Sequence, residues 1–149
     1  MSNTFYITTP IYYVNDKPHI GHAYTTILAD VLARFHRNLG YDTFFLTGLD
    51  EHGQKVQLAA AERNVDPQQH CDEMAPQFLE LWEELHISND DFIRTTEPRH
   101  KQVVQKFLQQ VFDKGDIYKD KYEGLYSVSE ERFITEKEAE SGQFHDIKE

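Results

Sequence analysis

The spacing of apolar residues changes twice within the first fifty positions. Residues 4–9, Thr-Phe-Tyr-Ile-Thr-Thr, are β-branched or aromatic and stop at Pro10, so they predict a short strand. From Gly21 to Leu39 large apolar residues recur at four-residue spacing, which predicts an amphipathic helix of about four or five turns. The continuous apolar run at 43–47 then predicts a strand that is buried on both faces of a parallel sheet.

Strand, helix and strand in this order make a βαβ unit, so the predicted fold class is α/β with a parallel sheet. In such sheets ligands bind beyond the carboxyl ends of the strands. The loops that follow Thr9 and Thr47 are therefore expected to face each other across a site.

Further helices are expected downstream. Residues 54–63 predict a short Ala-rich helix, and Asp66 has the pattern of an N-cap before a second helix, which Pro76 should kink or break. Residues 92–94 predict a strand, and the helix that follows it should end at Gly115. Beyond that glycine the chain changes to short extended pieces, which indicates the start of a second module.

Composition narrows the possible roles. The chain has 149 residues, the size of one domain, and its 26 acidic and 15 basic residues give a formal charge of -11. This acidity argues against nonspecific phosphate binding over the surface, so any nucleic-acid contact has to be local. No apolar run approaches a membrane-spanning length, and the single cysteine, Cys71, cannot form an internal disulfide. A cytoplasmic location without membrane contact is therefore expected.

The segment Pro18-His19-Ile20-Gly21-His22 lies where the first helix is expected to begin. Imidazoles three positions apart at a helix start share a face, beside unpaired N–H groups and the positive end of the helix dipole. Their N–H groups can stabilise charge on an attacked α-phosphate, and Gly21 lets a flat ring such as adenine approach. A helix start with one capping and one exposed histidine explains the same short motif without a ligand.

A second polar segment, residues 48–53, Gly-Leu-Asp-Glu-His-Gly, follows the second strand directly. By itself it fits half of a metal site or a turn with solvated charges. It lies at the carboxyl end of a strand beside the one that delivers the histidines, so its carboxylate should face the same crevice. A carboxylate in that place can hold a substrate ammonium group.

Together the two segments resemble the N-terminal part of the methionyl-tRNA synthetases, a family of class I aminoacyl-tRNA synthetases. The resemblance is carried by residues 5–15, 18–24, 44–48 and 50–53, and it continues at 91–96 and 115–118. It implies a Rossmann-like catalytic domain, with residues 1–115 as its first half and residues 116–149 as the start of a connective insertion. The implied reaction is activation of methionine with ATP and Mg²⁺ to methionyl-adenylate, followed by transfer to the 3′ end of tRNA(Met).

The resemblance also implies roles for single residues. His19 and His22 would contact ATP phosphates, and Gly21 would leave room for adenine. Asp50 would hold the methionine ammonium.

On the methionine side, the resemblance implies that Ile11 contacts the amino acid and that Tyr13 lines the same pocket. A flexible thioether is recognised by shape and by soft aromatic contacts, which suits this aromatic loop.

The chain departs from that family in three ways. It contains no Lys-Met-Ser-Lys-Ser loop and no anticodon-reading domain, so we expect a fragment that is inactive alone, with tRNA bound through the full-length protein. Residues 126–133 and 141–145 lack the paired cysteines that many relatives use for zinc, so no zinc is expected. Leu49 stands where relatives often have threonine.

Two other functions fit parts of the pattern. A nucleotidyl transferase with the same histidine pair would act on a small molecule without tRNA, although residues 8–10 and 50–52 favour the synthetase. A noncatalytic module that keeps the fold and binds a protein or RNA stays open for the separate chain. A reading frame that continues into a Lys-Met-Ser-Lys-Ser loop would exclude this second alternative.

Overall fold

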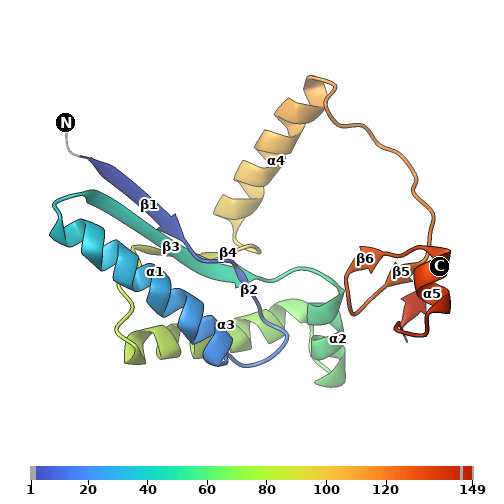
Figure 1. The fold of residues 1–149 in the computed structure, drawn as a ribbon, viewed down its shortest axis with the longest axis horizontal. Coiled ribbons are helices and arrows are strands. Elements are labelled where there is room, and N and C mark those ends of the chain that lie inside the picture. Colours follow the sequence, from blue (N-terminus) through green and yellow to red (C-terminus); the bar gives the residue numbers. More distant parts are fainter. Residues whose placement is uncertain (1–2, 145, 149) are drawn as a thin grey trace. The chain divides into compact units, whose positions relative to one another are not determined.

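The computed structural model describes residues 3–144 and 146–148. The chain divides into two compact units, of which the first ends at Gln105 and the second begins at Lys106 (Figure 1). Helix α4 (Pro98–Asp113) crosses this division. It ends just before Gly115, whose φ of +81° fits the expected helix stop.

The first unit is built on a parallel sheet. Its strands are β1 (Thr4–Thr8), β2 (Tyr12–Tyr13), β3 (Asp42–Asp50) and β4 (Asp91–Arg94). β3 is central, because Leu46 pairs with Thr8 on one side and with Asp91 on the other. β2 lies on the same side of β3 as β1, after the interruption at Pro10. The predicted α/β class is confirmed.

Two long helices cover one face of this sheet (Figure 1). The helices of the unit are α1 (Ile20–Asn38), the short α2 (Gln54–Glu62) and α3 (Pro67–Glu84). Phe45 and Leu49 point to the same face of β3, because they are four positions apart in a strand. Phe45 packs with Ala29 and Ala33 of α1, and the fully buried Leu49 packs with Phe78 of α3.

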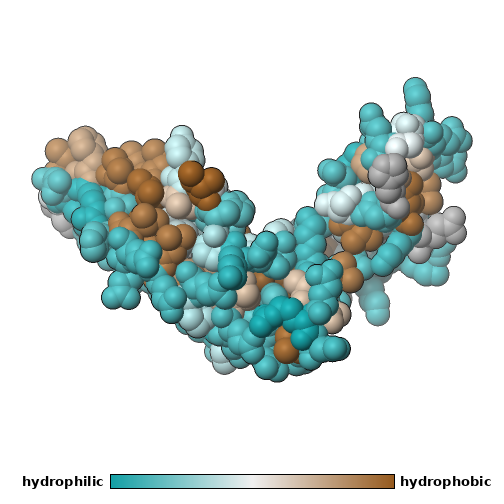
Figure 2. Space-filling view, turned by 90° about the horizontal axis from the view of Figure 1, so that it is seen from below, coloured by the Kyte–Doolittle hydropathy of each residue, from teal (hydrophilic) through white to brown (hydrophobic). Residues whose placement is uncertain are grey.

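Helix α1 contacts the sheet through its smallest side chains. Ala29 and Ala33 are buried, and the buried Asp30 accepts hydrogen bonds from the Ser88 N–H and hydroxyl at 2.7 and 2.6 Å. A surface helix normally turns its large apolar residues toward the core. In α1 and at its C-cap, Leu39, these residues are 41–59% exposed: Ile27, Leu28, Val31, Leu32, Phe35 and Leu39. They are separated along the helix from the buried Ala29 and Ala33, and Figure 2 shows apolar surface on the part of the first unit that contains α1.

The opposite face of the sheet is largely uncovered. Tyr6 is 60% and Phe44 46% exposed, and their rings stack with centroids 6.0 Å apart. The prediction that the apolar run at 43–47 is buried on both faces is therefore wrong for the described residues. The reason is that α1 and α3 both lie on the face of Phe45 and Leu49.

A kink or a break was expected at Pro76; helix α3 runs unbroken through it, so the break is absent. Its start is as predicted, since the Asp66 side chain caps it by accepting the Gln68 N–H at 2.8 Å. Proline removes one backbone hydrogen bond inside a helix. Buried residues on both sides of it, among them Met74 and Phe78, hold the two halves in one core.

The second unit contains a small antiparallel sheet. Its elements are β5 (Tyr126–Ser127), β6 (Arg132–Phe133), the short α5 (Glu136–Glu140) and β7 (Ile147–Lys148). β5 pairs with both other strands. Thr135 and Glu138 exchange hydrogen bonds at the start of α5 and so form a capping box.

Candidate active site

The histidine segment forms the start of α1. His19 is the N-cap, and its Nδ1 accepts the Gly21 backbone N–H at 3.1 Å. In return, Nδ1 of His22 accepts the His19 backbone N–H at 3.2 Å. This is a capping box with two imidazoles in place of the usual hydroxyl and carboxylate. Both histidines therefore cap the helix. The alternative considered from the sequence, a helix start without a ligand, expected one capping and one exposed histidine.

The capping hydrogen bonds fix where each imidazole carries its proton. A ring nitrogen that accepts a hydrogen bond has no proton, so each neutral ring of His19 and His22 carries its proton on Nε2. The two rings stack with centroids 3.8 Å apart. Two Nε2–H donors thereby lie beside the positive end of the α1 dipole, an arrangement suited to anionic oxygens.

The ring of His22 is held against an aromatic wall. Its centroid lies 4.7 Å from Tyr12 and 5.4 Å from Phe78. Burial lowers the pKa of His22, and the neighbouring His19 lowers it further. The neutral form that the capping bond requires is therefore favoured. Tyr12 is itself fixed, since its hydroxyl shares a buried hydrogen bond of 2.9 Å with Thr26 Oγ1.

Four of the predicted site residues line one hollow of about 420 Å³: Ile11, Tyr13, His19 and His22. Tyr12, Asn15, Asp16 and Lys17 complete its wall. Ile11 and Tyr13 are exposed, whereas Tyr12 between them is buried, as expected where successive side chains of a strand point to opposite faces. The structure thus brings the aromatic loop and the histidine pair together.

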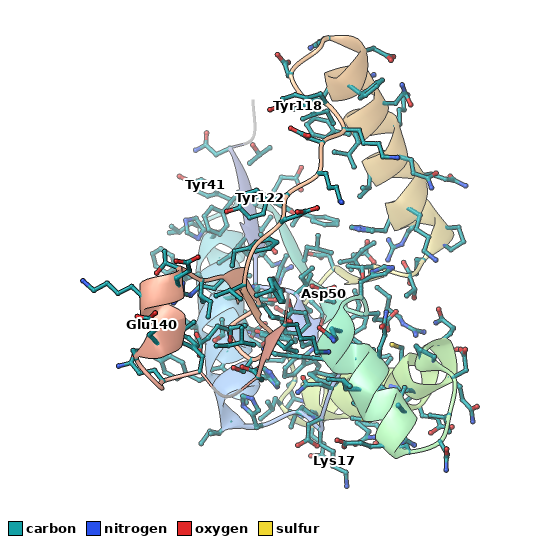
Figure 3. All side chains as sticks on the ribbon, turned by 90° about the vertical axis from the view of Figure 1, so that its right-hand side faces the viewer. Lys17, Tyr41, Asp50, Tyr118, Tyr122 and Glu140 are labelled. Atoms are coloured by element: carbon teal, nitrogen blue, oxygen red, sulfur yellow. The ribbon has the colours of Figure 1, made fainter. Side chains whose placement is uncertain are left out.

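Asp50 lies at the end of β3, near the start of α2 (Figure 3). It is not part of the wall of that hollow, but it pairs with Tyr13 in the parallel ladder of β2 and β3. Its Oδ1 accepts the His52 backbone N–H at 3.3 Å. Just after β1, the Thr9 hydroxyl shares a buried hydrogen bond of 2.7 Å with the hydroxyl of Thr47, which lies inside β3. The strand continues past Thr47, so the loop expected there begins only after Asp50. That the two loops face each other across a site stays a prediction.

At two positions a neighbouring atom lies so close to the backbone that only glycine fits without a shift. A Cβ on Gly21 would lie 2.9 Å from Cε1 of the His19 ring, so the capping histidine itself needs glycine at this position. A Cβ on Gly48 would lie 2.1 Å from the carbonyl oxygen of Ile93. Gly48 therefore allows β3 and β4 to pair closely two positions before Asp50. The sequence did not reveal this role.

The Asp50 loop rests on a buried ion pair that sequence reasoning missed. The Glu51 carboxylate is fully buried and accepts hydrogen bonds from Arg94 Nε at 2.6 Å and from the Thr96 hydroxyl. The Glu51 backbone N–H donates to Thr95 Oγ1 at 2.9 Å, and His52 Nδ1 contacts the same oxygen at 2.9 Å. The partners are more than forty positions apart, so sequence spacing gave no signal.

His70 and Cys71 have structural places. His70 is buried, with Nδ1 facing Arg63 Nη1 at 2.9 Å and Nε2 facing the Val14 carbonyl at 2.7 Å, so it ties α3 to the loop before the histidines. Burial, with Glu51 nearby, raises the pKa of Cys71 to about 11. Cys71 is thus a packing residue and not an activated thiol.

In the second unit, polar side chains join residues 127–129 to Asp146, in and beside the two segments that lack paired cysteines. The hydroxyls of Ser127 and Ser129 each donate to Asp146 Oδ1 at 3.2 Å, and the Ser129 N–H donates to Oδ2. His145 lies outside the described residues. Among the residues that the structure describes, no group of three or more histidine, cysteine or acidic side chains is arranged to hold a metal ion. Within residues 3–144 and 146–148, no helix has the length and apolar character needed to cross a membrane.

A parallel sheet, a helix start capped by two histidines and a carboxylate at the end of the central strand together define an α/β protein of the class I synthetase type. Comparison with known proteins agrees. The family described as tRNA synthetases class I (M) matches residues 5–143. The chain therefore belongs to this family, and the nucleotidyl transferase alternative loses its support.

The curated relatives are methionine–tRNA ligases. Those of Listeria monocytogenes and Bacillus subtilis are 58% and 57% identical to this chain, over 93% and 91% of its length. The enzyme of Rickettsia conorii is 59% identical over 93%. The match covers 21%, 20% and 27% of these three relatives, so the chain spans between a fifth and about a quarter of their length.

Solved structures give the same result. The methionyl-tRNA synthetase of Mycobacterium tuberculosis in complex with methionyl-adenylate superposes with a TM-score of 0.86 at 44% identity, over 93% of this chain and 27% of that one. A leucyl enzyme (LeuRS) of Agrobacterium radiobacter, in a ternary complex with tRNA and LeuAMS, has a TM-score of 0.77 at 23% identity, which shows the shared fold alone.

Proposed function

We propose that this chain supplies the ATP-facing part of a methionine–tRNA ligase, which activates methionine with ATP and transfers it to the 3′ end of tRNA(Met). The observation that carries the proposal is the reciprocal capping of His19 and His22, which leaves two Nε2–H donors at the start of α1. The relatives' names support the amino acid, and the solved complex with methionyl-adenylate supports the intermediate.

In the proposed first step, a carboxylate oxygen of methionine attacks the α-phosphorus of ATP. The new C–O–P bond forms as the bond from the α-phosphorus to the bridging oxygen breaks, and pyrophosphate leaves with that electron pair. Negative charge increases on the phosphate oxygens during this step. The Nε2–H groups of His19 and His22 stabilise that charge and keep their protons. Gly21 lets adenine approach its backbone on a side other than the one where a Cβ would meet the His19 ring.

The amino acid lies in the proposal beside the aromatic loop. Ile11 and Tyr13, both on the wall of the same hollow, contact the thioether side chain, which suits a flexible apolar group. Asp50, next to Tyr13 in the β2–β3 ladder, accepts the methionine ammonium. In this proposal one crevice has an acidic side, where Asp50 meets the methionine ammonium, and a histidine side, where His19 and His22 meet the ATP phosphates.

Magnesium is proposed to arrive with the triphosphate, as the substrate complex MgATP. We further propose that the second unit contains no zinc, because Ser127, Ser129 and Asp146 join the same segments through hydroxyl and carboxylate hydrogen bonds. Thiolates are the usual ligands of structural zinc, and the only cysteine in the sequence is Cys71. Metal analysis of the purified full-length protein tests this, and stoichiometric zinc would contradict it.

Residues 1–115 are proposed as the first half of the catalytic domain and residues 116–149 as the start of its connective insertion. The tRNA is bound through the full-length protein, which we propose acts in the cytoplasm. The chain alone is expected to show negligible turnover, since the clamp of ATP by a Lys-Met-Ser-Lys-Ser loop is missing from its sequence.

Methionine-dependent exchange of pyrophosphate into ATP, measured on the full-length protein, tests the activity. Replacement His22→Ala should lower the exchange rate by about 100-fold while methionine binding changes little, because the donor acts on developing charge. Equal exchange in the variant would contradict the role of His22. No exchange in the wild-type protein would instead favour the noncatalytic binding module.

A further inference from the structure

Asp50 is the last residue of β3, and the segment that follows it is held by side chains at the end of the neighbouring strand β4 and just after it. We propose that Glu51 and Arg94, the ion pair that joins the ends of β3 and β4, are the positioning residues that set the Asp50 carboxylate for the ammonium group of the amino acid. This inference rests on the proposed function, and it assigns to both residues a part in amino-acid selection.

The pair has the properties of a rigid support. The Glu51 side chain is fully buried and Arg94 is 23% exposed, with Nε and Oε1 2.6 Å apart. Thr96 donates to the second carboxylate oxygen, so both oxygens of Glu51 are occupied. Burial alone lowers the pKa of Arg94, but its hydrogen bonds to Glu51 and Asp72 raise it above the ordinary value. The guanidinium therefore stays charged and fixed between two carboxylates.

The support reaches Asp50 through the main chain. The Glu51 N–H, which belongs to the peptide bond that follows Asp50, donates to Thr95 Oγ1 at 2.9 Å. The Thr95 N–H donates in turn to the Leu49 carbonyl at 3.2 Å. Asp50 is thus held between two backbone contacts to Thr95, the residue directly after Arg94. A rotation of the peptide at either side would turn its carboxylate.

The charge arrangement adds selectivity. Asp50 and Glu51 are adjacent acidic residues, but of the two only Glu51 is paired with the half-buried Arg94. The arginine neutralises Glu51 in the interior and leaves the charge of Asp50 for a cation at the mouth of the site. Without this arrangement two adjacent carboxylates would compete for the ammonium group.

The test compares KM values for methionine and for ATP in pyrophosphate exchange by the full-length protein. Glu51→Gln keeps the shape and removes the charge that orders Arg94. It should raise the KM for methionine about tenfold or more, as expected when a binding group is displaced, and change the KM for ATP by less than about twofold. The matched control is Glu73→Gln, the same replacement in an exposed ion pair with Arg63, which should change neither value. Equal changes in both KM values, or none, would overturn the proposal.

A second pair of variants covers the case in which Glu51→Gln does not fold. Thr95→Val removes the acceptor of the Glu51 N–H, whereas Thr95→Ser keeps it. The proposal requires a raised methionine KM in the valine variant and its recovery in the serine variant, and equal values in both would contradict it. Asp50→Asn separates this inference from the proposed function. If it leaves methionine binding intact, the proposed role of Asp50 fails. If it weakens binding and Glu51→Gln does not, only the role of the ion pair fails.

Discussion

The two sides of the proposed crevice, the histidine side at His19 and His22 and the acidic side at Asp50 to His52, are held in place by different kinds of contact. On the histidine side, each capping bond joins residues two or three positions apart, and His19 is exposed. On the acidic side, the contacts of Glu51 and His52 join residues 43–45 positions apart and are largely buried. The histidine side is a property of the start of one helix, and the acidic side is a property of the sheet. Substitutions should therefore affect the two sides very differently.

The largest expected effect is on the acidic side. Arg94→Ala leaves the buried Glu51 carboxylate without its cation and should lower the free energy of unfolding by about 3–5 kcal/mol. Urea unfolding of the chain measures this. The matched variant Arg99→Ala, in an exposed ion pair with Asp91, should cost less than about 1 kcal/mol. Similar losses for both would show that the acidic side is not held by its buried pair.

Gly48→Ala should come next. Its Cβ would collide with the Ile93 carbonyl at 2.1 Å, so β3 and β4 must separate, at a cost of about 3 kcal/mol, the upper end for overpacking. Gly40→Ala serves as control, because open space surrounds that position and only its φ of +80° resists alanine, at about 1 kcal/mol. Urea unfolding that ranks Gly40→Ala as the more harmful would refute the close approach of the strands.

The histidine side should lose little stability. His19→Ala removes the N-cap of α1 and should lower the free energy of unfolding by about 1 kcal/mol, whereas His19→Asn keeps a capping acceptor and should be close to the wild type. In the full-length protein both variants should exchange pyrophosphate poorly, because neither retains an imidazole Nε2–H. Normal exchange by the asparagine variant would mean that His19 serves only to cap the helix.

The smallest effect concerns pH. Since burial, and then His19, lower the pKa of His22 in the folded chain, the unfolded chain takes up this proton first as the pH falls. Stability should therefore decrease below a pH of about 6.5, the ordinary histidine value, and this part of the decrease should be absent in His22→Gln. Unfolding free energies between about pH 7.5 and pH 5.5 measure it. An identical pH dependence in both proteins would contradict the lowered pKa.

The same contrast explains what could be predicted from sequence. Strand, helix and strand were readable because their apolar spacing is local, and the proline-preceded histidines lay at the helix start for the same reason. Tyr12 was within reach as well, since alternation along a strand places it opposite Tyr13. Hydrogen bonds from Glu51 to residues 94–96 were not readable, because nothing in the spacing of the chain connects those positions.

Burial was predicted less well than secondary structure. Phe44 lies in a continuous apolar run, but it is exposed because both long helices of the first unit cover the other face of the sheet. The break expected at Pro76 is absent, because packing on both sides of a proline can outweigh one lost hydrogen bond. Periodicity reports which residues share a face, and it does not report what that face meets.

Helix α1 has a mechanical consequence for the site. Its 19 residues form a rod of roughly 28 Å, with the two imidazoles at one end and the outward apolar stripe along its length. Ala29 and Ala33 pack against the sheet, and hydrogen bonds of Thr26 and Asp30 also hold the rod to neighbouring segments. Both imidazoles are tied to the first turn of the rod by their capping bonds. A tilt of α1 would therefore move His19 and His22 together.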